Sequence, residues 1–295
     1  MIKPPPLRTG DAVGIIAPSS GFDSELFEKG IAVLEEMGFR PVLGSRLFER
    51  NRHLAGSDEQ RFSDLAEMVQ NNDVAAVLAA RGGFGSIRLL DRLNFRIFSH
   101  NPKIFAGFSD LTVLLNVIAQ RGFLITFHAP NVTTLSNVSE QSKESFFRMV
   151  TSDVFPPLQW QRARVLRPGS ARGTLAGGNL TTLCHLMGTP FEPSFDGCVL
   201  MIEDVNEPLY RIDRMLTQLK LGGKLERLEA VLLGGFDGCQ DVEAVWERVL
   251  ELIPDPNVAI WADMPLGHGL DNYTWPIGAE AILAEEGVVR FDEGG

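Results

Sequence analysis

Ser109 is the residue of this sequence whose position most favours covalent chemistry. The apolar segment 104–108 predicts a buried strand that ends directly before it, and an apolar face at helical spacing follows it, formed by Leu111, Leu114, Leu115 and Ile118. A serine at such a turn has its hydroxyl beside the unpaired N–H groups of the helix, where developing negative charge is favoured. This is the layout of a nucleophile elbow, although the Gly-x-Ser-x-Gly pattern is only half present, because Gly107 matches and position 111 is leucine. The alternative is that Ser109 simply caps the helix, a role that serine fills well.

A nucleophilic serine needs a base and a group that orients the base. His268 is the best candidate for the base, because it lies between two glycines in a polar loop, whereas the other histidines look like core, helix-face or surface residues. Glu203 is the best candidate for the orienting acid, because it ends the strand predicted at residues 199–202, and functional groups of α/β proteins gather at that edge of a sheet. Glu207 and Asp204 compete with Glu203, and the whole acidic group could instead be a solvated turn.

An acyl-transfer site also needs hydrogen-bond donors for the oxyanion. The elbow itself supplies the N–H of Asp110, and the pair Gly82-Gly83, at the end of another predicted strand, lets a second backbone N–H approach closely. The same segment, Arg81 to Gly85, can be read as a phosphate loop, but it lacks the Gly-x-Gly-x-x-Gly spacing and a Walker lysine. The sequence contains no His-Glu-x-x-His motif or other group with metal-ligand spacing, so we expect a mechanism without metal or cofactor.

The order of elements indicates an α/β protein. Strand-like and helix-like segments alternate from Asp11 to about Val150, as in a mostly parallel sheet covered by helices. Residues 151–172 are rich in proline and arginine and predict a linker, after which the alternation restarts. We therefore expect an N-terminal domain over residues 1–150 and a C-terminal domain over residues 173–295.

The individual elements follow from hydrophobic periodicity and capping signals. Strands are predicted at residues 12–17, 41–43, 74–80, 104–108, 124–127, 198–202, 230–233 and 258–261, and a hairpin over 281–291 turns near Gly287. Helices are predicted over residues 25–37, from a capping box at Ser57 and Gln60, through Ile87, Leu90 and Leu93, after Ser109, and over 140–150, 179–187, 211–221 and 242–252.

Composition narrows the class of partner. A net charge of −11 disfavours nucleic acid and anionic membranes as partners. The longest apolar run, Val74 to Ala80, is far shorter than the roughly 20 residues of a membrane helix, and the N-terminus lacks the apolar region of a secretory signal, so we expect a cytoplasmic protein. Cys184, Cys198 and Cys239 lack the spacing of a disulfide framework or a zinc site and are interpreted as core residues.

Five motifs together resemble one family, the serine LD-carboxypeptidases, which include murein tetrapeptide carboxypeptidases and microcin C immunity peptidases. The resemblance runs in order from about residue 11 to residue 290, with Phe84 where many members have tyrosine and Leu209 where a proline often stands. The motifs are Ala80-Arg-Gly-Gly-Phe-Gly-Ser86, Gly107-Phe-Ser-Asp110, Gly177-Gly-Asn-Leu180, the segment from Ile202 to Gln218, and Pro265-Leu-Gly-His-Gly269.

The resemblance implies a fold, a site and a substrate. The fold would be a flavodoxin-like N-terminal domain, similar to class I glutamine amidotransferases, followed by a smaller C-terminal α/β domain. Ser109 would be the nucleophile, His268 the base and Glu203 the orienting acid. The substrate would be murein tetrapeptide, which loses its terminal D-alanine, and the protein would be a homodimer. The oxyanion hole would be formed by Asp110 and Gly83, and the candidates for substrate binding are Arg81, Gly82, Arg211 and Glu207, of which the two arginines could bind the terminal carboxylate.

Two alternatives stay open at this point. The first is hydrolysis of a peptidyl-adenylate or acyl-sulfamoyl toxin, which an aromatic residue of the second domain placed to stack on adenine would favour. The second is a non-catalytic protein that binds a peptide or a nucleotide, in which Ser109 is only a helix cap.

Overall fold

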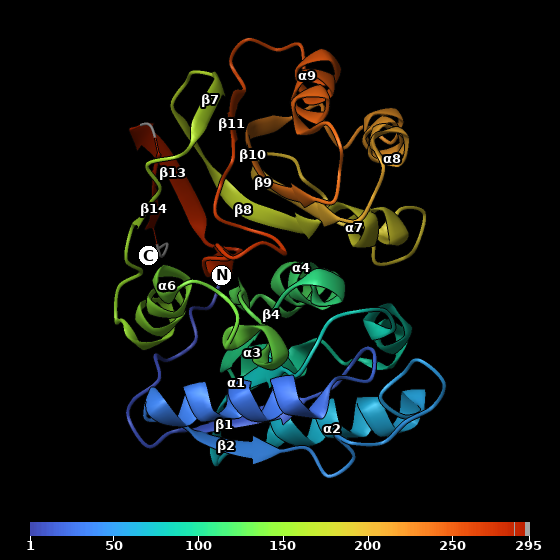
Figure 1. Cartoon of the computed structure of the whole chain (residues 1–295), viewed down its shortest axis with the longest axis vertical. Coiled ribbons are helices and arrows are strands. Elements are labelled where there is room, and N and C mark those ends of the chain that lie inside the picture. The colour runs from blue at the N-terminus through green and yellow to red at the C-terminus, as the bar shows by residue number, and fades with distance from the viewer. Residues whose placement is uncertain (286, 293–295) are drawn as a thin grey trace.

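The inner strands of the first sheet, at residues 12–16, 74–79 and 104–107, are apolar along their whole length, as expected where helices cover both faces of a parallel sheet. The computed structural model describes residues 1–285 and 287–292, and its first sheet has six strands in the order β12-β5-β4-β3-β1-β2. Five of these strands run parallel: β1 (Ala12–Ile16), β2 (Arg40–Leu43), β3 (Val74–Ala79), β4 (Ile104–Gly107) and β5 (Thr126–His128). The helices packed around them are α1 (Ser24–Glu36), α2 (Asp58–Gln70), α3 (Arg96–His100), α4 (Thr112–Gly122), α5 (Val132–Leu135) and α6 (Glu140–Thr151), shown in Figure 1.

The second sheet has eight strands in the order β6-β14-β13-β8-β9-β10-β11-β7. Its centre, from β8 to β11, is parallel, and both flanks pair antiparallel. The strands are β6 (Leu158–Gln159), β7 (Arg164–Arg167), β8 (Ala171–Asn179), β9 (Cys198–Val205), β10 (Leu228–Asp237), β11 (Ala259–Ala262), β13 (Glu280–Glu285) and β14 (Val288–Asp292). The helices of this part are α7 (Leu180–Leu186), α8 (Leu209–Leu221) and α9 (Val242–Leu252).

The predicted fold class is confirmed: the protein is α/β, and both sheets are mostly parallel at their centres. The capping box forms at the start of α2, where Ser57 and Gln60 exchange hydrogen bonds. The predicted helix through Leu90 and Leu93 is wrong in type, because a 3-10 helix, η1 (Ser86–Arg92), stands there and ends before Leu93. Residues 151–172, predicted as a linker, contain β6 and β7, which pair with the second sheet.

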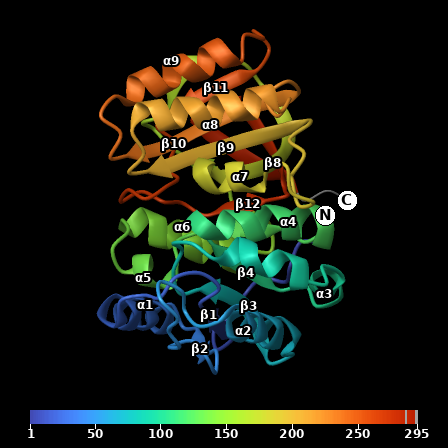
Figure 2. The ribbon, with the colours of Figure 1, turned by 90° about the vertical axis from the view of Figure 1, so that its right-hand side faces the viewer.

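The chain crosses back from the second sheet to the first before it ends. β12 (Trp275–Ile277) pairs antiparallel with β5 and forms an edge of the first sheet, between the two halves of the molecule in Figure 2. A strand of three residues was not predicted, because its pairing partner lies more than a hundred residues earlier in the chain. No helix in the described part of the chain is long and apolar enough to cross a membrane.

The helix that follows Ser109 is docked on the second sheet by buried polar contacts. The side-chain amide of Asn116 in α4 donates to the carbonyl of Gly177 at 2.9 Å and accepts from the N–H of the same residue at 2.9 Å. One turn earlier, the hydroxyl of Thr112 accepts from the N–H of Asn179 at 3.0 Å. The Gly-Gly-Asn motif at the end of β8 therefore provides the contact surface for α4.

Candidate active site

Ser109 lies at a strained turn between β4 and α4. Its φ angle is +64°, a backbone conformation that residues other than glycine adopt rarely and at some cost in free energy. A single 3-10 turn, η2 (Ser109–Leu111), leads into α4, and neither helix start is capped by the Ser109 side chain. The hydroxyl oxygen lies instead 3.1 Å from Nε2 of His268. The geometry thus favours an elbow over a helix cap.

The other ring nitrogen of His268 meets Glu203. Nδ1 lies 2.8 Å from Oε2 of Glu203, whose side chain is fully buried in β9. The close approach depends on Gly267, because a Cβ atom there would lie 3.2 Å from Oε2 and the residue has a φ of +129°. Serine, imidazole and carboxylate therefore form one continuous line of contacts, the arrangement in which a carboxylate orients a histidine base toward a serine nucleophile.

The surroundings of His268 favour its protonated form. Burial is the largest influence and lowers the pKa of the imidazole, but the hydrogen bond with Glu203 and the negative charges of Glu203, Asp204 and Asp237 outweigh it, so the pKa is raised above its ordinary value. An imidazole that gains a proton so readily is a capable base in its neutral form.

The structure separates Glu203 from the two acids that compete with it in the sequence. Glu207 lies just before α8 and points to Arg211 in the first turn of this helix, at 3.4 Å. Asp204 is buried and accepts hydrogen bonds from Asn179 and Thr181, and burial raises the pKa of its carboxyl group. Of the three, only Glu203 has a hydrogen bond to the base among the described residues.

The glycine pair after β3 lies against Ser109. A Cβ atom at Gly82 would lie 2.8 Å from Cβ of Ser109, so no larger residue fits without movement of one of the two segments. Gly83 has a φ of +105° and packs against Ser20. The peptide that joins Gly82 to Gly83 is therefore beside Ser109, where an oxyanion donor is needed.

A buried carboxylate ties the elbow to the glycine segment. Oδ2 of Asp110 accepts from the hydroxyl of Ser19 at 2.5 Å and from the N–H of Ser86 at 2.8 Å, and the Ser86 hydroxyl donates to the carbonyl of Asp110 at 2.7 Å. Burial raises the pKa of the Asp110 carboxyl group, while the donors from Ser19 and Ser86 oppose the shift. Three segments of the site are held together at this one residue.

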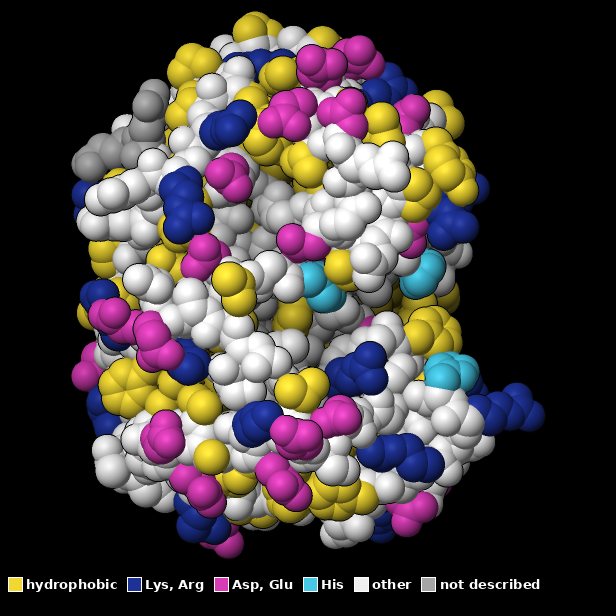
Figure 3. Space-filling model, viewed as in Figure 1, with side chains coloured by type: hydrophobic (Ala, Val, Ile, Leu, Met, Phe, Trp, Pro, Cys, Tyr) yellow, Lys and Arg dark blue, Asp and Glu magenta, His cyan; other side chains and the backbone are white. Residues whose placement is uncertain are grey.

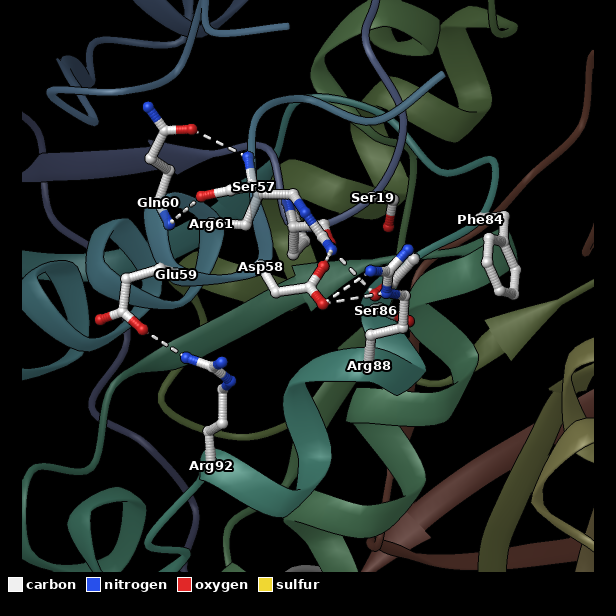
Figure 4. A network of polar contacts seen from close by, with 12 residues as sticks. Ser19, Ser57, Asp58, Glu59, Gln60, Arg61, Phe84, Ser86, Arg88 and Arg92 are labelled. Carbon is white, nitrogen blue, oxygen red and sulfur yellow. Dashed lines mark hydrogen bonds and ion pairs between the residues drawn. The ribbon is translucent and has the colours of Figure 1, made fainter. Parts of the chain in front are cut away.

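A second buried side chain, Arg61 of α2, contacts the segments that contain Ser19 and Ser86. Its guanidinium donates to the carbonyl groups of Pro18 and of Gly85, the latter at 2.9 Å. Figure 4 shows the network around it, in which Asp58 binds both Arg61 and Arg88 close to Ser86. The glycine segment is thus anchored at its carboxyl end by Arg61 and by the ion pairs around it.

A cavity of about 600 Å³ opens beside Ser109. The surface is hollowed where the two halves meet, and histidine side chains lie along this boundary in Figure 3. Arg81, Gly82 and Gly83 line the cavity, whereas Arg211 and Glu207 do not. Its other lining residues are Asp23, Leu26, Phe108, Ser109, Asn131, Thr133, Thr134, Asn137, Val205, Asn206 and His268.

Asn131 is a site residue that the sequence analysis missed. It is buried in the segment between β5 and α5, and its Oδ1 accepts from the N–H of Phe108, the residue before Ser109, at 3.2 Å. The available signal was its position shortly beyond the carboxyl end of a predicted strand, where α/β proteins collect functional groups. Thr133, Thr134 and Asn137 follow it into the cavity wall.

Comparisons with known proteins agree with the motifs. Residues 13–129 match the family model of the LD-carboxypeptidase N-terminal domain, and residues 172–283 match that of the LD-carboxypeptidase C-terminal domain. A Bacillus subtilis protein named probable murein peptide carboxypeptidase is 38% identical, with 95% of this chain and 91% of that protein covered. The murein tetrapeptide carboxypeptidase of Pseudomonas aeruginosa is 35% identical, with 92% of each chain covered.

A solved structure extends the similarity to the fold as a whole. The crystal structure of an MccF-like protein from Bacillus anthracis superposes with a TM-score of 0.92 over 100% of both chains, at 24% sequence identity. At this identity the likeness concerns the fold alone. Both halves of the molecule and their connection are shared with it.

Proposed function

This chain belongs to the LD-carboxypeptidase family, and from that premise we propose that it is a serine peptidase that releases the terminal D-alanine of murein tetrapeptide. Carboxypeptidase activity rests on the family. The serine mechanism and the substrate are our proposal, and one observation carries the mechanism: the unbroken line from Ser109 through His268 to the buried Glu203 at the mouth of a cavity.

The proposed reaction is acyl transfer in two steps. Oγ of Ser109 attacks the carbonyl carbon of the amide between the L-centre of meso-diaminopimelate and D-alanine, and Nε2 of His268 takes the hydroxyl proton. The same nitrogen gives this proton to the departing amine of D-alanine, which leaves an ester on Ser109. Water, deprotonated by His268, then hydrolyses the ester and releases the tripeptide. The N–H groups of Asp110 and Gly83 are the proposed oxyanion donors.

The cavity wall supports a peptide rather than an adenylate as substrate. MccF of Escherichia coli is named a microcin C7 self-immunity protein. An aromatic ring from the C-terminal half, placed to stack on adenine, would favour an adenylate substrate for this chain. Within the described residues, the cavity lining from that half consists of Val205, Asn206 and His268. Phe108, the aromatic residue of the lining, comes from the N-terminal half and packs on His268 at a ring distance of 4.9 Å.

Purified protein is expected to convert murein tetrapeptide to tripeptide and free D-alanine, and to leave an acyl-sulfamoyl adenylate intact. The measurement is mass spectrometry of both incubations run side by side. Cleavage of the adenylate with no release of D-alanine would overturn the choice of substrate, and no reaction with either would argue against a peptidase of this specificity. A tetrapeptide with L-alanine at its end serves as the control for stereochemistry.

Arg81 is our candidate for binding the terminal carboxylate of the substrate. It is exposed in the cavity wall, and its guanidinium is oriented by a hydrogen bond to the carbonyl of Gly21 at 2.9 Å. A hydrogen bond to a charged group contributes about 1.5–3 kcal/mol, so Arg81→Ala should raise KM for tetrapeptide roughly 10- to 100-fold. Arg211→Ala is the matched control, since Arg211 lies outside the cavity wall; an equal effect of both variants would exclude a specific role for Arg81.

The setting of this reaction is also part of the proposal. Release of D-alanine from a soluble tetrapeptide belongs to the recycling of peptidoglycan fragments, which places the protein in the cytoplasm with a small peptide as its partner. A homodimer remains a prediction from the family, which sedimentation of the purified protein would test. A monomer at working concentration would contradict it.

A further inference from the structure

The loop that carries His268 is held from behind by two buried polar side chains, Asn272 and His128. Asn272 is 1% exposed and His128 is completely buried. Oδ1 of Asn272 accepts from the N–H of Gly267, the residue before the base, at 3.2 Å. The same oxygen lies 3.1 Å from Nε2 of His128. One amide oxygen therefore joins the base loop to β5 of the first sheet.

The donors and acceptors of this pair are determined by their neighbours. A backbone N–H can only donate, so the oxygen of the Asn272 amide must face Gly267. Because that oxygen also faces Nε2 of His128, Nε2 must carry a proton and Nδ1 must be bare. Burial lowers the pKa of His128 to about 4, which keeps the ring neutral near pH 7. Nδ1 of His128 and Nδ2 of Asn272 are buried and have no hydrogen-bond partner among the described residues. The pair therefore leaves two polar atoms unsatisfied while it keeps the hydrogen bond to the base loop.

Aromatic packing connects the same pair to the nucleophile. The ring of His128 lies 5.7 Å from that of Phe108, and Phe108 lies 4.9 Å from the ring of His268. Phe108 directly precedes Ser109 in the chain. Asn272 and His128 are thus connected to His268 in two ways, through the backbone of Gly267 and through the ring of Phe108. A displacement of Asn272 would therefore move the imidazole of His268.

The backbone around Asn272 is itself fastened to α6. The N–H of Asn272 donates to the hydroxyl of Ser142 at 2.9 Å, and the N–H of Thr274 donates to the hydroxyl of Ser145 at 3.1 Å. At the cap of the same helix, the N–H of Ser139 donates to the carbonyl of Leu270 at 2.8 Å. The three serines are spaced by three along α6 and therefore lie on one side of it. The base loop, although late in the sequence, is bound to the N-terminal half.

We propose that Asn272 is the positioning residue of the base, and that His128 is the neutral donor that fixes its amide. Together they set the imidazole of His268 relative to Ser109, while Glu203 contacts its other nitrogen. The inference rests on the proposed function, because it assigns a role within that reaction.

Replacing Asn272 tests this role. Asn272→Leu removes the acceptor, and we expect kcat for tetrapeptide to fall about 10²-fold with little change in KM, since a misplacement on the order of 1 Å costs that much. The matched control is Thr274→Val, because the Thr274 hydroxyl is buried and has no partner among the described residues, whereas its backbone N–H donates to Ser145. Equal rates for the two variants would overturn the proposal.

Asn272→Asp separates positioning from a merely structural role. The carboxylate keeps an acceptor for Gly267, so we expect much of the lost kcat to return. Its charge would join those of Glu203 and Asp204 on β9 and Asp237 on β10, with neutral His128 on β5 as its other neighbour, and should move the acid limb of the kcat/KM profile to higher pH. A profile identical to that of the wild type, at an equally low rate as Asn272→Leu, would contradict the proposal.

A measurement without substrate distinguishes failure of this inference from failure of the proposed function. Nitrogen chemical shifts of the labelled imidazoles should show His128 of the wild-type protein with a proton on Nε2 and none on Nδ1. The opposite tautomer would overturn the inference even in an active enzyme. A wild-type protein that releases no D-alanine but has the expected tautomer would contradict the function alone. Thermal melting checks the variants, and if Asn272→Leu does not fold, the Asp variant and the tautomer decide.

Discussion

Ser109→Ala is expected to reduce the release of D-alanine from murein tetrapeptide by about 10⁴-fold or more, because removal of the nucleophile from a coupled triad abolishes the acyl-enzyme route. The hydroxyl has its hydrogen bond with His268 and no role in capping either following helix, so its loss should leave the folded state intact. Release is measured by mass spectrometry, and thermal melting reports on folding.

A second serine offers a matched control for this variant. The hydroxyl of Ser136 is buried and has no partner among the described residues, so Ser136→Ala makes the same chemical change away from the nucleophile. We expect Ser136→Ala to keep wild-type activity and labelling by a fluorophosphonate, and Ser109→Ala to lose both. Substantial release of D-alanine by a folded Ser109→Ala variant would remove Ser109 from the mechanism.

Glu203→Gln should be almost as damaging, with a fall in kcat of about 10⁴-fold, because an amide in place of the carboxylate no longer selects the tautomer in which Nε2 can accept the serine proton. The substitution preserves shape at a fully buried position, where Oε2 lies 2.8 Å from Nδ1 of His268. Glu207→Gln is the control, since Glu207 contacts Arg211 and not the base. Similar losses in both variants would mean that Glu203 has no special role.

The same variant should change the pH dependence of the residual activity. In the wild type, the acidic surroundings raise the pKa of His268, so the base is still protonated somewhat above its ordinary pKa of about 6.5, and kcat/KM should rise with pH through that higher value. Without the charge of Glu203, burial lowers the pKa with less opposition. The acid limb should therefore move to lower pH, and a limb that stays in place would show that another group controls it.

The proposed nucleophile and base, Ser109 and His268, could be selected from the sequence because their signals are local. Ser109 follows an apolar strand and precedes a helical face, and His268 is flanked by two glycines, one of which is needed to admit Glu203. The choice between Glu203 and Glu207 could not be made this way. Both are acidic residues in or shortly after β9, and the contacts of each side chain distinguish them.

The parts that could not be predicted depend on contacts between distant segments. Asn272 and His128 are 144 residues apart, and neither belongs to a recognisable motif. β8 contains three polar or charged residues and three glycines among its nine, a composition that does not suggest a strand until its neighbours β9 and β13 are known. Asn131, Thr133 and Thr134 line the cavity, but they lie on a segment without an acidic or basic residue that would draw attention to it.

The return of β12 to the first sheet means that the N-terminal half is completed by a strand from the end of the chain. A gene fragment ending before β12 would leave β5 as an open sheet edge, and the Gly-His-Gly loop would lose the strand that follows it in the chain. An exchange of C-terminal halves between relatives would place the β12 of one protein against the β5 of the other, at the edge of the sheet whose strand β4 precedes Ser109. Variation in the second half is thus constrained by the backbone of the first.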